Sequence, residues 1–188
     1  MSRCPAVKKV VLWGLCDGAS AALIYVQRSR DARVAGVCIL NPWVRTASSL
    51  ARTHIKHYYG QRLMDRQFWT KLMTGGVKIT GAFRELISKF RVSTTRSGAK
   101  SVAIPYQSRM ALAISESRVS VLLLTSGRDF TAKEFLDFVA TDSTWAGVFA
   151  TARLQRVDIA EADHTFSTAF FRGLVEDATI AWIRNLLA

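Results

Sequence analysis

Two continuous apolar segments constrain the fold of this chain more than any other feature. Val34–Leu40 (VAGVCIL) and Val119–Thr125 (VSVLLLT) show almost no alternation between apolar and polar residues. Such runs are typical of strands that are buried on both faces of a parallel sheet. Asn41-Pro42 ends the first run, because proline cannot continue a strand ladder. Ser126-Gly127 closes the second. The sequence therefore predicts a parallel sheet covered by helices.

Further strands and helices alternate around these two segments. Val7–Trp13 and Leu154–Ile159 are predicted strands, Gly18–Arg28 a predicted helix, and Phe170–Leu187 a closing amphipathic helix. Strands that alternate with helices indicate an α/β fold with a mostly parallel sheet. The chain has 188 residues, which is enough for one domain with a sizeable core.

The interval between the two apolar strands is too long for a single crossover helix. It contains four helical patterns, Ala47–Tyr59, Arg62–Met73, Ile79–Phe90 and Tyr106–Ser115. An insertion after a strand, on the edge where ligands bind, usually acts as a cap or lid. We predict one domain over residues 1–188, with a core at 1–42 and 119–188 and a helical cap at 43–118.

The segment Gly14-Leu15-Cys16-Asp17-Gly18 lies where a nucleophile elbow belongs, between a predicted strand and a predicted helix. The tight turn requires small flanking residues, which Gly14 and Gly18 supply. Cys16 is then the nucleophile, and the backbone N–H of Asp17 donates to the developing oxyanion. We expect the helix N-terminus and a nearby imidazole to acidify the thiol. The alternative is that Cys16 is a small buried apolar residue, as most cysteines are.

Two further polar residues follow predicted strands. Asp129 comes directly after Val119–Thr125 and is the candidate acid, although it also precedes a helical segment and suits a helix cap. Asp137 and Asp142 are weaker alternatives, because they lie in or after that helical segment. His164 follows the last strand and is the candidate base, with a surface histidine as the alternative.

The three candidates follow separate strands in the order nucleophile, acid, base, which is the chain order of α/β-hydrolases. In this interpretation His164 deprotonates Cys16 or forms a thiolate–imidazolium pair with it, and Asp129 orients the histidine. Asp163 is too close to His164 in sequence to hold its ring from behind, and we expect it to orient the loop instead.

Several of these segments resemble the exosortase A system-associated hydrolases of the first type, an α/β-hydrolase family found beside bacterial exopolysaccharide genes. The similar segments span essentially the whole chain: Val11–Ala22 (VLWGLCDGASAA), Leu40–Thr46 (LNPWVRT), Thr53–Leu72, Ser126–Phe130 and Ala162–Phe166. The cysteine elbow is also similar to that of dienelactone hydrolases. The resemblance implies a reaction class, acyl hydrolysis or transfer, and a genomic setting, but no substrate. We expect a small-molecule or lipid-linked acyl substrate and no cofactor.

The chain departs from this family at its start. Family members carry several strands before the elbow, whereas Gly14 is only thirteen residues from Met1. The missing part would include half of the sheet and the loop that supplies the second oxyanion donor. We therefore expect Val7–Trp13 to be an exposed edge strand, open to aggregation or self-association, and the chain as given to be inactive or weakly active.

Composition narrows the remaining classes of function. The net charge of +12 favours anionic partners, yet no basic run exceeds two residues and no nucleic-acid motif is present. Ile79–Arg91 suits a lid helix over an acyl pocket, or a helix on a membrane surface. His54 and His57 lack an evident third ligand, so we expect no metal site. Three cysteines in no disulfide pattern, with no signal peptide, favour a cytoplasmic location.

Overall fold

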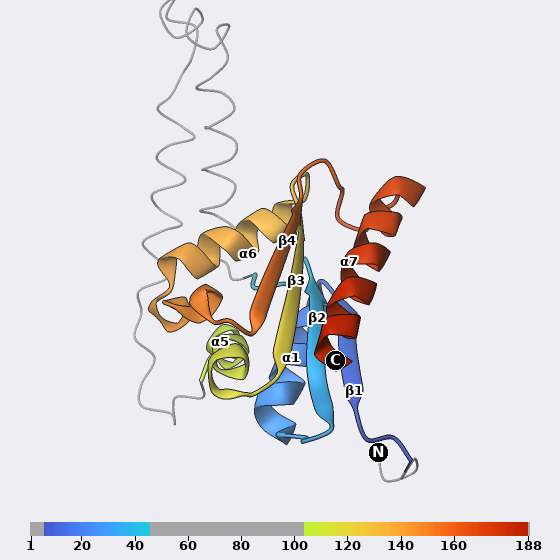
Figure 1. Ribbon diagram of the computed structural model, residues 1–188. Coiled ribbons are helices and arrows are strands. Elements are labelled where there is room, and N and C mark those ends of the chain that lie inside the picture. The colour runs from blue at the N-terminus through green and yellow to red at the C-terminus, as the bar shows by residue number, and fades with distance from the viewer. Residues whose placement is uncertain (1–5, 46–103, 188) are drawn as a thin grey trace, which may run out of the picture. The chain divides into compact units, whose positions relative to one another are not determined.

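The computed structural model describes residues 6–45 and 104–187. Four strands form one sheet in the order β1-β2-β3-β4, and every neighbouring pair is parallel. The strands are β1 (Val10–Leu15), β2 (Val34–Leu40), β3 (Ser120–Ser126) and β4 (Leu154–Ile159). The predicted parallel α/β architecture is confirmed (Figure 1).

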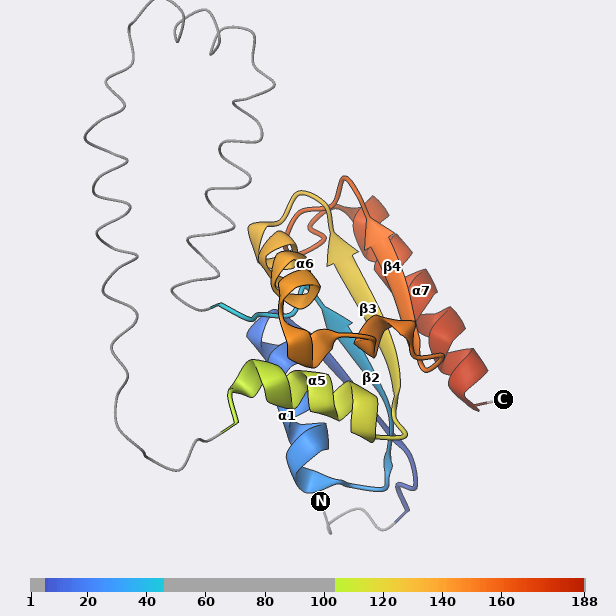
Figure 2. The same cartoon turned by 90° about the vertical axis from the view of Figure 1, so that its left-hand side faces the viewer.

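Helices cover both faces of this sheet. Helices α1 (Asp17–Ser29), α5 (Tyr106–Glu116) and α6 (Phe130–Thr141) lie on one face, and α7 (Ala169–Leu187) lies on the other, as Figures 1 and 2 show. Two short 3-10 helices, η2 (Ser143–Trp145) and η3 (Val148–Ala150), lead from α6 to β4.

The central strands divide their side chains between the two helical layers. In β2, Val37 and Ile39 belong to the apolar cluster under α1 and α5, whereas Cys38 and Leu40 belong to the cluster under α7. All four are almost completely buried. Burial on both faces explains why this strand carries no polar alternation in the sequence.

The register of the strands brings their carboxyl ends to one edge of the sheet. Leu40 pairs with Leu15 of β1 and with Leu124 of β3, and Ser126 pairs with Ile159 of β4. The segments that follow β1, β2, β3 and β4 therefore begin side by side. This edge is the one where parallel α/β sheets bind their ligands.

Strand β1 lies at one end of the described sheet and pairs there with β2 alone. Its Trp13 side chain is 53% exposed. Leu12, by contrast, packs against the apolar cluster on the α1 side. An edge strand with an exposed aromatic residue and unpaired backbone groups is a surface on which another strand can pair.

Helix α5 differs from the sequence-based expectation. We predicted Tyr106–Ser115 as part of the cap, but this helix packs against α1. Its buried side chains, Met110, Ala111, Ala113 and Ile114, belong to the main apolar cluster. The apolar face of α5 has the same helical period whether it covers a lid or a core, so the pattern alone does not distinguish the two. The predicted division at 43–118 otherwise remains a prediction.

The other predicted cap helices, Ala47–Tyr59, Arg62–Met73 and Ile79–Phe90, lie outside the described residues, as do His54 and His57. None of the helices that the structure describes is long and apolar enough to cross a membrane.

Candidate active site

Cys16 occupies a sharp turn between β1 and α1. Its φ of 58° and ψ of −119° are unusual for a residue with a side chain, and they indicate stored backbone strain. Hydrogen bonds hold the turn in place. The Cys16 N–H donates to Leu40 O at 2.9 Å, and the Cys16 carbonyl accepts from the N–H groups of Trp43 at 3.2 Å and Ser20 at 3.3 Å. The elbow geometry predicted for Gly14–Gly18 is therefore present.

The two glycines of the elbow are not equivalent. A Cβ on Gly14 would lie 2.5 Å from the carbonyl carbon of Gly18, so the close approach of strand and helix requires glycine at position 14. A Cβ on Gly18 would meet nothing within 4 Å. We expected both positions to need a small residue, but no described neighbour restricts the space at Gly18.

Asp129 and His164 are joined by a hydrogen bond. His164 Nδ1 lies 2.9 Å from Asp129 Oδ2, although the two residues are 35 positions apart. A carboxylate oxygen only accepts, so Nδ1 carries a proton, and in the neutral imidazole Nε2 then has the lone pair. Within the described part of the chain, Nε2 has no hydrogen-bond partner. This arrangement is the one in which an imidazole can act as a general base.

Asp129 also caps α6. Its carboxylate accepts from the backbone N–H of Thr131 at 3.1 Å and of Ala132 at 3.0 Å, and the residue is only 7% exposed. Asp129 therefore makes both contacts that the sequence suggested, one with the histidine and one with the N-terminus of a helix. The cap keeps the carboxylate in one orientation, which in turn fixes where the His164 ring is held.

The alternative carboxylates are used elsewhere. Asp137 is part of α6, and Asp142 caps η2 by accepting from the Thr144 N–H at 2.9 Å. Asp163 accepts from the backbone of Thr165 at 3.2 Å and from both the backbone and the hydroxyl of Ser167. The Ser167 hydrogen bonds lower the pKa of Asp163. Asp163 thus shapes the loop that carries His164, as its position in the sequence suggested.

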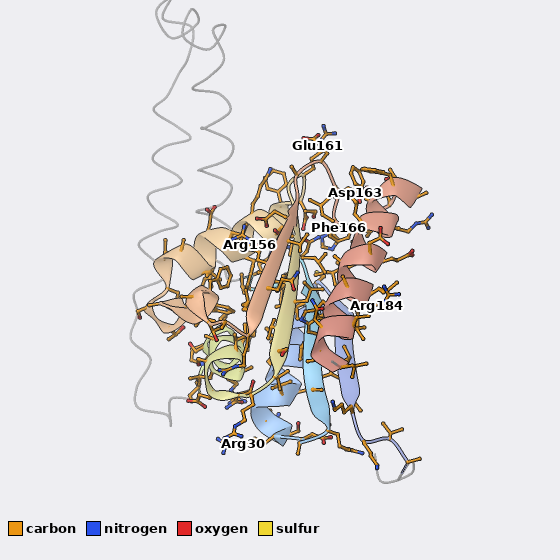
Figure 3. All side chains as sticks on the ribbon, in the orientation of Figure 1. Arg30, Arg156, Glu161, Asp163, Phe166 and Arg184 are labelled. Carbon is orange, nitrogen blue, oxygen red and sulfur yellow. The ribbon has the colours of Figure 1, made fainter. Side chains whose placement is uncertain are left out.

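The loops after β3 and β4 are packed tightly together. A Cβ on Gly127 would lie 2.1 Å from the carbonyl oxygen of Ala160, so this contact requires glycine. The Arg128 N–H donates to Ala162 O at 3.1 Å, and the Arg128 side chain forms an ion pair with Glu161. Figure 3 labels Glu161, Asp163 and Phe166 in the loop that follows β4. These contacts hold the acid and the base at a short distance.

The thiol of Cys16 is not acidified in this environment. Burial is the largest effect and raises its pKa above the ordinary value of 9.0, and the carboxylates of Asp17 and Asp129 raise it further. A hydrogen bond from the Asp17 backbone and the charge of Arg45 act in the opposite direction but do not outweigh burial. Our expectation of an acidic thiol is therefore wrong, because desolvation of the thiolate exceeds the help from the helix N-terminus.

Cys16 and His164 do not form a hydrogen bond with each other within the described residues. The Asp17 backbone N–H, whose hydrogen bond lowers the pKa of the Cys16 thiol, belongs to the residue directly after the candidate nucleophile, where an elbow places an oxyanion donor. In the parts of the chain that the structure describes, no group of three or more His, Cys, Asp or Glu residues is arranged to hold a metal ion.

Comparison with solved structures identifies the architecture. The chain is similar to a structure from a study of two esterases from the fungus Rhizomucor miehei, with a TM-score of 0.52 and 14% sequence identity. It is also similar to a carboxylesterase from the ammonia-oxidizing thaumarchaeon Nitrososphaera gargenis, with a TM-score of 0.50 and 10% identity. The chain has part of the α/β-hydrolase fold.

The matches cover most of this chain and less of the proteins compared. They include 96% of this chain but 52% of the fungal chain, and 97% of this chain but 67% of the archaeal one. No family model matches the sequence, and no curated protein matches it. At these identities the likeness concerns the fold, and the chemistry has to be argued from the residues themselves.

The sequence analysis missed one residue beside the candidate base. Asn41 was assigned only the end of β2, but its side chain contacts both Ser126 and the backbone of His164. The sequence did contain a sign that Asn41 belongs to the site. It is a polar residue directly after a buried strand, on the sheet edge where the candidate residues lie.

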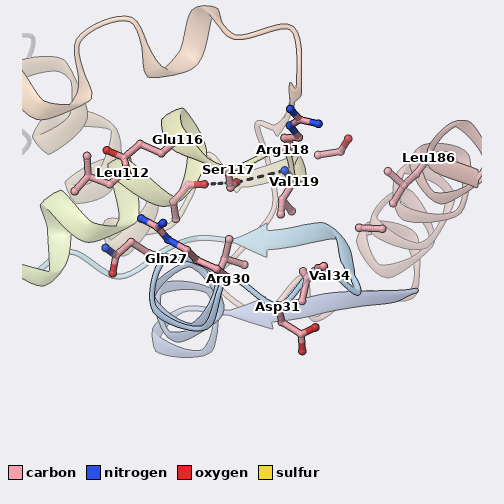
Figure 4. A pocket seen from close by; sticks show the side chains of 15 residues that line it. Gln27, Arg30, Asp31, Val34, Leu112, Glu116, Ser117, Arg118, Val119 and Leu186 are labelled. Carbon is pink, nitrogen blue, oxygen red and sulfur yellow. Dashed lines mark hydrogen bonds between the residues drawn. The ribbon is translucent and has the colours of Figure 1, made fainter. Parts of the chain in front are cut away.

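A pocket of about 630 Å³ lies at the other edge of the sheet (Figure 4). Its lining includes Arg30 after α1, Val34 at the start of β2, and Ser120 at the start of β3. The amino ends of the strands are opposite to the edge that carries Cys16 and His164. This pocket is therefore separate from the candidate active site.

Proposed function

We propose that the chain is a thiol-dependent hydrolase or acyltransferase that acts on an ester, a thioester or a similar acyl compound. Cys16 is the nucleophile, His164 the general base, and Asp129 the residue that orients the histidine. The observation that carries this proposal is the 2.9 Å hydrogen bond between His164 and buried Asp129, on the sheet edge that also carries the strained Cys16 elbow. The esterase-like fold is consistent with it.

The raised pKa of Cys16 favours one form of the mechanism over the other. The resting site holds a neutral thiol rather than a thiolate. As Sγ attacks the acyl carbon, Nε2 of His164 takes the thiol proton, and Asp129 stabilises the imidazolium. The Asp17 N–H donates to the oxyanion.

The second half of the reaction returns the enzyme to its starting state. The tetrahedral intermediate collapses, and the leaving group departs with the proton from His164, which leaves an acyl thioester on Cys16. Water, or another acceptor, then loses a proton to Nε2 and attacks the thioester carbon. Collapse of this intermediate releases the acyl product, and Nε2 returns its proton to the departing sulfur, which restores the Cys16 thiol.

The finer assignment rests on the sequence resemblance to exosortase A system-associated hydrolases. It implies a bacterial enzyme linked to exopolysaccharide genes. The cysteine usage favours a cytoplasmic location, and we propose a small-molecule or lipid-linked acyl substrate. The net charge of +12 favours an anionic substrate or an anionic membrane surface over a neutral one.

The test measures turnover of p-nitrophenyl acetate and of an acyl thioester, and detects the acyl-enzyme by intact-protein mass spectrometry. We expect wild-type protein to gain the mass of one acyl group on Cys16. Cys16→Ala should abolish the adduct, and His164→Ala should slow its formation. Cys38→Ala is the matched control, because Cys38 is fully buried and its pKa is raised to about 12. Acylation that persists in Cys16→Ala would refute the assignment of the nucleophile.

A second candidate function is a hydrolase-like module that binds a partner and does not catalyse. Two observations favour it: the raised pKa of Cys16, and the unpaired edge of β1 in the described sheet. One kind of partner would add a strand to the edge of β1, and a second copy of this chain could do so. The other kind would be an anionic lipid or polysaccharide.

Alkylation by iodoacetamide separates the two functions. Because its pKa is raised, Cys16 can react faster than Cys4 and Cys38 near neutral pH only if His164 takes its proton, so a catalytic Cys16 should lose this advantage in His164→Ala. Equal reactivity of Cys16 and Cys4 would favour the non-catalytic module. Binding to an anionic surface would weaken steeply as the salt concentration rises.

A further inference from the structure

Asn41 joins three separate strand ends through one buried side chain. Its Nδ2 donates to Ser126 Oγ at 2.8 Å and to the His164 carbonyl at 2.9 Å, and its Oδ1 accepts from the Ser126 N–H at 2.9 Å. Its own N–H donates to Leu124 O at 3.0 Å. The residue is 0% exposed. The ends of β2 and β3 and the loop after β4 are thereby tied together.

Asparagine suits this position for two physical reasons. The φ of Asn41 is 43°, a left-handed conformation that asparagine tolerates better than most residues with a side chain. The carboxamide also supplies both donors and an acceptor, and all three meet partners. An aspartate has the same shape, but when ionised it has no donor for the His164 carbonyl.

We propose that Asn41 is a positioning residue for His164, and this inference rests on the proposed function. Asn41 holds the backbone of His164, and Asp129 holds Nδ1 of its ring. These two anchors, one on the backbone and one on the ring, restrict the direction of Nε2, the atom that takes the proton from Cys16. With Asn41 absent, the loop keeps the contacts of Asp163 and Arg128, but the His164 backbone loses its own hydrogen bond.

A purely structural role for Asn41 would also involve these bonds, so the test needs a readout that follows His164 itself. Asn41→Asp retains the volume and the acceptor for the Ser126 N–H, and it replaces the donor to His164 by an oxygen. Asn41→Gly suits the φ of 43° and removes the whole side chain. Ser126→Ala is the matched control, since it removes a hydroxyl partner of Asn41 and leaves the bond to His164 in place.

Two measurements are made on each folded variant of the full chain. The first is the titration of the His164 ring by NMR, together with the signal of its Nδ1 proton. The second is the pH dependence of p-nitrophenyl acetate turnover, with kcat and KM separated. We expect Asn41→Asp and Asn41→Gly to lower kcat by about tenfold to a hundredfold, as small displacements of a catalytic group do, with little change in KM. The His164 titration should shift, while Ser126→Ala stays close to wild type in both readouts.

The outcomes separate this inference from the proposed function. Folded Asn41 variants with a wild-type His164 titration and kcat would show that Asn41 only supports the fold, and would overturn the inference. Absence of turnover in wild type would defeat the proposed function, while the NMR titration would still test Asn41. If neither variant folds, the contact is tested in the wild-type protein by measuring nuclear Overhauser effects between the Asn41 side-chain amide and the His164 backbone. Their absence would overturn the inference.

Discussion

Replacing Asp129 should separate two effects that one carboxylate produces. Its oxygens cap α6 through Thr131 and Ala132, and one of them also accepts from His164. Asp129→Ala removes every one of these bonds. Asp129→Asn keeps the shape and one acceptor oxygen, so it can still cap the helix, but its NH₂ group cannot replace the second oxygen. The two variants should therefore differ in stability and agree in lost activity.

The size of the stability effect follows from the buried cap. Loss of an N-cap costs roughly 0.5–2 kcal/mol, and a carboxylate that is only 7% exposed belongs at the upper end because its donors stay buried. We expect Asp129→Ala to lower the free energy of unfolding by about 2 kcal/mol, which is a decrease in Tm of roughly 4–8 °C for a chain of this size. Asp129→Asn retains one of the two backbone bonds and should lose about 1 kcal/mol.

The effect on chemistry should be equal in both variants and much larger. Without a carboxylate at Nδ1 the imidazole can adopt the wrong tautomer, and an amide at that place in a Ser-His-Asp triad lowers kcat on the order of 10⁴-fold. Guanidinium chloride unfolding measures the first effect, and acylation of Cys16 under single-turnover conditions measures the second. Asp129→Asn that acylates at the wild-type rate would refute the role of Asp129. Asp129→Ala with unchanged stability would refute the cap.

Three further outcomes are expected. Gly14→Ala should destabilise the protein by about 3 kcal/mol in chemical unfolding, because its Cβ would lie 2.5 Å from backbone atoms of Gly18. Gly18→Ala, at an exposed position, should be neutral or stabilise α1 by up to about 1 kcal/mol. Equal losses of stability in the two variants would contradict the asymmetry of the elbow. Gly127→Ala should displace the loop after β4, since its Cβ would lie 2.1 Å from Ala160 O, and a wild-type His164 NMR spectrum in this variant would argue against it. Burial raises the pKa of Cys38 from 9.0 to about 12, so the native state keeps this proton longer than the unfolded chain. That stabilisation is complete below about pH 9 and is lost as the pH rises toward about 12; Cys38→Ala should flatten the pH dependence of stability there, and an unchanged slope would refute this.

The local pattern predicted the strand bounds to within a few residues, and Val119–Thr125 is observed one residue later, as Ser120–Ser126. Val34–Leu40 and Leu154–Ile159 are predicted and observed with the same ends. Strand β1 was predicted at Val7–Trp13 but spans Val10–Leu15. The predicted strand included Lys8 and Lys9, whereas pairing with β2 begins only at Val10, opposite Val34, where the apolar run also begins.

The candidate residues were recognisable because each follows a strand. A parallel sheet gathers the carboxyl ends of its strands at one edge, so order along the chain was enough to nominate Cys16, Asp129 and His164. The sequence did not distinguish whether Asp129 is a helix cap or a partner of histidine, and the structure shows both contacts. It also did not place α5, whose apolar face fits a lid and a core equally well.

The amino-acid sequence by itself determined the α/β class, the elbow and the positions of the candidate residues, because these depend on neighbours within a few residues along the chain. Only the tertiary structure decided the direction of the Cys16 pKa shift and the contacts of Asn41. The first depends on burial and on the charge of Asp129. The second depends on partners 85 and 123 positions away. Local periodicity carries no record of such distant contacts, since they arise only when the strand ends meet.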